Sequence, residues 1–98
     1  MTVSSARIAS QDPARLIRRL CRHWAHKFPV SLDERQGDIR LPLGDCLLQA
    51  GEGQLLVRLR AEDAEQVAQF QTVVADHLQR MAGDEALVFA WQAEARPA

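Results

Sequence analysis

Hydrophobic and polar positions change their spacing along the chain, and the first change marks a strand followed by a helix. Val3, Ala6 and Ile8 lie among small polar residues, which predicts a short strand over residues 2–10. Asp12 followed by Pro13 is typical of a helix start. An aspartate is a favoured N-cap, and a proline fits the first turn because the N–H groups there have no partner within the helix. We expect this helix over residues 13–27. Its apolar stripe is Leu16, Ile17, Leu20, Trp24 and Phe28, and Pro29 ends it.

From residue 30 to residue 59 the apolar period changes to two, which predicts one-sided strands in an antiparallel meander. Gly37, Gly44 and the cluster 51–53 fall between the apolar runs, so we expect turns at these glycines. Pro42 has no N–H to donate to a ladder, and we expect it at an edge or a bulge. The alternating apolar positions are Val30, Leu32, Ile39, Leu41, Leu43, Cys46, Leu48, Ala50, Leu55, Val57 and Leu59.

Helical spacing returns over residues 62–82, and Gly83 supplies a stop signal. Residues 86–92 alternate again and predict a closing strand. The expected order is strand, helix, four strands, helix, strand (β-α-β-β-β-β-α-β). This order favours an α+β fold, in which an antiparallel sheet of about five to six strands carries both helices on one face. A ferredoxin-like sandwich with an enlarged central hairpin is the nearest named alternative.

Length and composition indicate one ordinary globular unit. The chain has 98 residues, 47% of them hydrophobic and 26% charged, which is enough for one core and too small for two functional halves. We expect a single domain over residues 1–93 and a frayed tail over 94–98. With no span of about 20 apolar residues and no export signal, we expect a cytoplasmic protein with no membrane contact and reduced thiols.

Charge is unevenly distributed, although the net charge is only −1. The first helix carries Arg15, Arg18, Arg19, Arg22 and Lys27 with no acid among them, whereas acids crowd the second helix. Guanidinium groups bind carboxylates and phosphates in bidentate fashion, so the basic helix is a candidate binding surface. Nucleic acid is not a favoured partner, because the chain has no tyrosine and its late aromatic residues occupy expected core positions.

The Cys-Arg-His-Trp-Ala-His segment also suggests a metal site, formed by Cys21, His23 and His26 with Cys46 as a fourth ligand. Helix geometry argues against it, because Cys21 and His26 lie about 140° apart around a regular axis. His23 and His26 can converge, but they would need ligands from elsewhere. Cys21 is also a candidate reactive thiol beside Arg22 and two histidines, although small core residues are the simpler role for both cysteines.

A resemblance to a known family adds to these predictions. The segments LCRHWAHKFPV and GDIRLPLGDCLLQA resemble the small bacterial family catalogued as domain of unknown function 2218, with Leu41 and Trp24 where many relatives have Phe. The resemblance implies a stand-alone α+β domain. It also implies an association with siderophore and iron metabolism, because some members occur beside siderophore uptake and reduction proteins. The matching positions are Cys21, His23, His26, Lys27, Gly44 and Cys46, and the family assigns no active site to any of them.

We therefore expect a binding or accessory domain rather than an enzyme, with no cofactor. Its expected site is one edge of the first helix, which would contact a partner protein or a small anionic ligand. The residues of this edge are Arg19, Arg22, His23, His26 and Lys27. Two alternatives stay open: a metal- or thiol-dependent redox protein using Cys21, Cys46, His23 and His26, and a structural homodimer in which basic and acidic helices meet.

Overall fold

The structure is a computed structural model that describes residues 2–94. Its elements follow the predicted order of one strand, one helix, four strands, one helix and a final strand. In chain order they are β1 (Thr2–Ala9), α1 (Pro13–Trp24), β2 (Val30–Leu32), β3 (Gln36–Leu41), β4 (Gly44–Gly51), β5 (Gln54–Ala61), α2 (Ala64–Ala82) and β6 (Gln92–Ala93).

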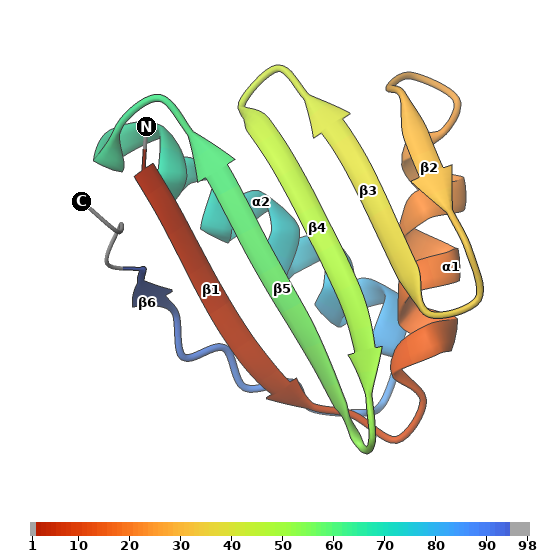
Figure 1. Ribbon diagram of the computed structural model, residues 1–98. Coiled ribbons are helices and arrows are strands. Elements are labelled where there is room, and N and C mark those ends of the chain that lie inside the picture. The colour runs from red at the N-terminus through yellow and green to blue at the C-terminus, as the bar shows by residue number, and fades with distance from the viewer. Residues whose placement is uncertain (1, 95–98) are drawn as a thin grey trace.

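The six strands form one sheet in the order β2-β3-β4-β5-β1-β6, and all neighbours are antiparallel. Both helices lie on the same face (Figure 1). Helix α1 packs mainly on β3 and β4, and α2 packs on β5 and β1. The predicted α+β fold with two helices on one sheet face is therefore confirmed, and within residues 2–94 no helix covers the other face.

The core lies between the sheet and the helices, as the period of two predicts. Ile39, Cys46 and Leu59 are directly paired across β3, β4 and β5, and all three side chains are fully buried. Their neighbours in the strands point to the opposite face. On the helix side, Leu20 of α1 and Phe70 of α2 are also fully buried. One-sided strands thus give the molecule one buried face and one open face.

Helix α1 begins as predicted and ends three residues early. The Asp12 side chain accepts a hydrogen bond from the Arg15 N–H at 3.1 Å, and Pro13 follows at the first turn. The helix ends at Trp24, where the Lys27 N–H bonds to the Trp24 carbonyl in a tighter turn. Pro29 disfavours α geometry in the residue before it, so the helix unwinds ahead of the proline. His26 and Lys27 consequently leave the helix.

The predicted turn at Gly37 is wrong, because this glycine lies inside β3 and is buried. A Cβ placed there would come within 2.5 Å of Cys21 Sγ and 2.9 Å of Ile17 Cγ2. Gly37 therefore allows α1 to pack closely on β3. In the sequence alone, a glycine with this packing role resembles a turn residue. The turn between β3 and β4 instead contains Pro42 and Leu43, and Gly44 follows it with a positive φ of 152°.

The predicted closing strand over residues 86–92 is also wrong over most of its length. Only Gln92–Ala93 forms a strand, paired with Ser4 and Ser5 of β1. The side chain of Gln79 donates to the Glu85 carbonyl and accepts from the Leu87 N–H. These two backbone groups are therefore not available for hydrogen bonds to a neighbouring strand. The segment buries Leu87 without forming a strand.

The predicted frayed tail begins at Glu94, which is the last described residue. The Glu94 N–H bonds to the Val3 carbonyl at 3.0 Å, and its side chain forms an ion pair with Arg58. Residues 95–98 of the predicted tail lie outside the described part of the chain. Neither of the two described helices is long and apolar enough to cross a bilayer.

Candidate functional site

The outer face of α1 is a stripe of arginines. Arg15, Arg18 and Arg22 recur at helical spacing and are exposed, while the opposite stripe of the helix is buried against the sheet. Their guanidinium groups have no hydrogen bond or ion pair within residues 2–94. No acid precedes them in the first turn of the helix. We call Arg15, Arg18 and Arg22 the α1 basic stripe.

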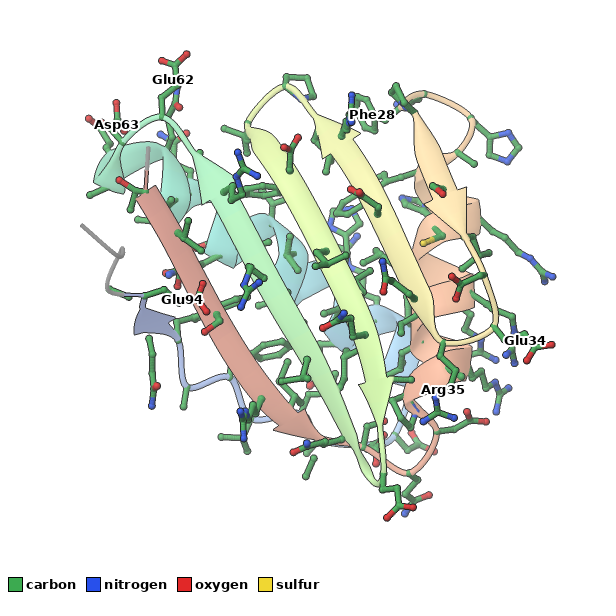
Figure 2. The ribbon with its side chains drawn as sticks, in the orientation of Figure 1. Phe28, Glu34, Arg35, Glu62, Asp63 and Glu94 are labelled. Carbon is green, nitrogen blue, oxygen red and sulfur yellow. The ribbon has the colours of Figure 1, made fainter. Side chains whose placement is uncertain are left out.

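Two acidic residues of the second helical segment lie away from this stripe. Glu62 and Asp63 are exposed at the start of α2, at the upper left of Figure 2, whereas α1 lies at the right, behind β2 and β3. Asp63 accepts the Gln66 N–H at 2.9 Å and caps α2, so its carboxylate already has a structural partner. Glu62 and Asp63 are therefore separated from the stripe, although the body of α2 packs against α1.

Arg19, a predicted site residue, has a bond within the fold. Its Nη1 donates to the Met81 carbonyl at 2.7 Å, which is one of the carbonyls left unpaired at the end of α2. A cation at a helix C-terminus is also favoured by the helix dipole. Arg19 therefore ties α1 to α2, while Arg22 stays exposed in the stripe.

The His23 ring is directed toward α2 and not toward His26. Its ring centroid lies 5.3 Å from that of His77, and the His77 ring lies 4.9 Å from Trp24. His77 Nδ1 is 2.7 Å from the Val73 carbonyl, which favours the tautomer with the proton on Nδ1 and leaves Nε2 as an acceptor. Sequence reasoning missed His77, and the only signal for it was its position on α2 beside the apolar stripe.

The predicted metal ligands do not converge. His26 and Lys27 lie exposed in the turn after α1, whereas Cys21 and Cys46 are 1% and 0% exposed in the core. In the region from residue 2 to residue 94, no group of three or more His, Cys, Asp or Glu side chains is arranged to hold a metal ion. Among the predicted ligands, His23 has the imidazole of His77 beside it.

Both thiols are held in their neutral form. Burial raises the pKa of Cys21 to about 11, and the negative charge of Asp38 adds to the effect. Burial also raises the pKa of Cys46, with further contributions from Cys21 and Asp38. Since the thiolate is the nucleophile and metal ligand, both cysteines are poor candidates for chemistry near neutral pH. Their environment is that of packing residues.

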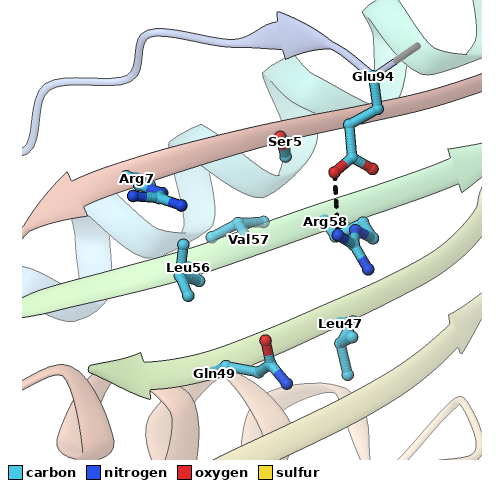
Figure 3. A pocket seen from close by; sticks show the side chains of 8 residues that line it. All are labelled: Ser5, Arg7, Leu47, Gln49, Leu56, Val57, Arg58 and Glu94. Atoms are coloured by element: carbon cyan, nitrogen blue, oxygen red, sulfur yellow. Dashed lines mark hydrogen bonds and ion pairs between the residues drawn. The ribbon is translucent and has the colours of Figure 1, made fainter.

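The open face of the sheet carries a second group of polar side chains. One row across the strands contains Ser5, Arg58, Leu47 and Asp38, which are cross-strand neighbours. A hollow of about 140 Å³ lies over this row (Figure 3). Its lining residues are Ser5, Arg7, Leu47, Gln49, Leu56, Val57, Arg58 and Glu94. The alternation of residues predicted that Arg58 would face away from the core, but not that a hollow would form there.

Comparison with known proteins places the chain in a family. The sequence model of a family described as "Uncharacterized protein conserved in bacteria (DUF2218)" matches residues 5–92. The chain belongs to this family, as its helix-end and Pro-x-Gly-x-Cys segments led us to expect.

One solved structure shares the fold. It is titled "NMR structure of PA4090 from Pseudomonas aeruginosa" and has 42% sequence identity to this chain. The match covers 94% of this chain and 96% of that chain, with a TM-score of 0.79. A search of curated proteins gave no match.

Proposed function

We propose that this chain is a non-enzymatic cytoplasmic binding domain that docks an acidic surface of a partner protein on the α1 basic stripe. The observation that supports the proposal most directly is that Arg15, Arg18 and Arg22 project together from one helix, and no acid is bonded to their guanidinium groups within residues 2–94. Exposed arginines in such a row offer bidentate bonds to carboxylates. Lys27 adds a positive charge in the turn after the helix, where His26 is also exposed.

A protein surface suits this stripe better than a small anion does. The stripe lies on the convex outer side of a helix, and the hollow beside Arg58 on the sheet face is lined by no residue of α1. A small ligand gains most of its affinity by burial in a concave site, whereas an extended acidic surface can contact several arginines at once. The family resemblance supports a partner that belongs to siderophore or iron metabolism.

Charge reversal on the stripe tests the proposal. We expect Arg18→Glu combined with Arg22→Glu to weaken binding of a fluorescein-labelled oligoglutamate peptide by about fivefold or more at low salt, measured by anisotropy. Arg19 is left unchanged because its bond to Met81 would confound the result. The control, Arg40→Glu with Arg80→Glu, makes the same change in net charge away from the stripe. Equal loss in both double variants, or no loss in either, would refute the docking surface.

A second copy of the chain is an alternative acidic partner. Glu65 and Asp76 are exposed on α2, and the α1 stripe of one copy could meet them on another. Light scattering at high protein concentration separates the two cases. A mass of two chains that falls to one after the Arg18→Glu and Arg22→Glu changes would support the homodimer, and a mass of one chain throughout would exclude it.

The metal-dependent alternative has one supporting observation, the approach of His23 to His77. Elemental analysis of protein purified without tags or chelators tests it. Stoichiometric zinc, copper or iron that is lost on His77→Gln substitution would favour the metal hypothesis. Its thiol-dependent form is weakened by the burial of Cys21 and Cys46.

A further inference from the structure

The open sheet face carries a hollow whose chemistry differs from that of the α1 basic stripe. The hollow lies over β1, β5 and β4, on the face opposite to both helices (Figures 1 and 3). Its volume of about 140 Å³ is smaller than the roughly 300–1,000 Å³ of sites for drug-sized ligands. A ligand held within this hollow alone would have only a few heavy atoms.

Two arginines on adjacent strands border this hollow. Ser5 is paired with Arg58, and Arg7 with Leu56, so Arg7 and Arg58 are diagonal neighbours on one face. Diagonal neighbours across a strand pair lie about 7–8 Å apart, within reach of long side chains. Both guanidinium groups can therefore reach one small anion.

The remaining lining combines an apolar floor with one amide. Leu47 and Leu56 lie on the same open face, half-buried, and Gln49 is paired with Leu56. Methyl groups beside two guanidinium groups favour a ligand that has both a charged and an aliphatic part. A bare inorganic anion would leave the two leucines in contact with water.

The chain itself places a carboxylate in this site. Glu94 Oε1 lies 2.9 Å from Arg58 Nη2 (Figure 3). The backbone of Glu94 is held by its N–H bond to the Val3 carbonyl. Arg58 and Glu94 are 54% and 31% exposed, so a competing anion can reach the pair. The guanidinium of Arg7 has no hydrogen bond or ion pair within residues 2–94.

From these contacts we infer that the hollow is a binding site for a small aliphatic monocarboxylate, which displaces the Glu94 side chain from Arg58. The ligand carboxylate bonds to Arg58 and Arg7, and its short alkyl part covers Leu47 and Leu56. Glu94 acts as an internal competitor that lowers the affinity of the open site. This site is independent of the α1 basic stripe, because it lies on the other face of the sheet.

A titration with sodium butyrate tests the inference, followed by two-dimensional amide NMR at constant ionic strength. We expect saturable shifts confined to the strands around Ser5, Leu56 and Arg58. Glu94→Gln should tighten binding about two- to fivefold, the range expected for removal of an exposed competing ion pair. Arg58→Gln should abolish saturation, and Arg7→Gln should weaken it. The matched control Arg18→Gln, on the α1 basic stripe, should leave butyrate binding unchanged.

Several results would overturn the inference. Shifts of equal size with butylamine or added sodium chloride would show that no carboxylate site exists. Tighter binding of inorganic phosphate than of butyrate at the same residues would remove the role given to Leu47 and Leu56. Weaker butyrate binding in Glu94→Gln would show that Glu94 builds the site rather than competes for it. Saturable binding that persists in Arg58→Gln would place the ligand elsewhere.

Discussion

Substitution of Gly37 by alanine tests the close contact between α1 and the sheet. The new Cβ would lie 2.5 Å from Cys21 Sγ and 2.9 Å from Ile17 Cγ2, well inside the roughly 3.5–4.0 Å at which carbon atoms attract. Both neighbours are 1% exposed, so neither can swing into solvent. Overpacking of this kind costs about 1–3 kcal/mol. Alanine would otherwise stabilise a strand by about 0.5–1 kcal/mol relative to glycine, which leaves a net loss of about 0–2.5 kcal/mol.

Thermal and urea unfolding measure this loss directly. A net loss near 1 kcal/mol lowers the Tm of a domain of this size by about 4–8 °C. In a Cys21→Ala background, which removes the Sγ contact, the cost of Gly37→Ala should shrink by at least about 0.5 kcal/mol. Gln36→Ala, at the exposed neighbouring position, should change stability by less than about 0.5 kcal/mol. A Tm that rises in Gly37→Ala would refute the close approach of α1 to β3.

Three further predictions concern stability and the thiols. Arg19→Gln should cost about 0.5–1.5 kcal/mol in urea unfolding because it removes the bond to the Met81 carbonyl, whereas Arg18→Gln should cost less than about 0.5 kcal/mol. Asp63→Ala should cost about 0.5–2 kcal/mol, because the Gln66 N–H loses its cap; unchanged stability would contradict this cap. The pKa of Cys21 rises from 9.0 to about 11 on folding. The unfolded chain therefore loses protons that the folded chain keeps, and stability present below pH 9 should fall between pH 9 and 11. The slope is up to about 1.4 kcal/mol per pH unit for each thiol. It should flatten in Cys21→Ala, and both thiols should resist Ellman's reagent at pH 7.5 in the folded protein.

The elements that the sequence predicts well are those whose signals are local. Asp12 and Pro13 determine the start of α1 through a cap and a fixed φ, and the structure shows both. The period of two predicts which side chains of β3 to β5 are buried, because successive side chains must point to opposite faces. Helix geometry also separates Cys21 from His26 correctly, although the helix ends before His26.

The features that the sequence did not predict depend on contacts between distant segments. Gly37 resembles a turn residue until α1 is seen packed over it. Residues 86–91 alternate like a strand, but the side chain of Gln79 binds the backbone of Glu85 and Leu87. His77 lies 54 positions after His23 in the chain, and only helix packing brings the rings together. The hollow beside Arg58 likewise exists only once three strands are paired.

Mapping where an acidic peptide binds tests whether the α1 basic stripe docks an acidic protein surface. We predict that an oligoglutamate peptide, titrated at low salt, shifts the amide signals of Arg15, Arg18, Arg22 and Lys27. These shifts should weaken as salt approaches about 0.15 M, because exposed charges are then screened within about 8 Å. The signals of β1 and β5 should not move. Shifts centred on the open sheet face, or none along α1, would contradict the account.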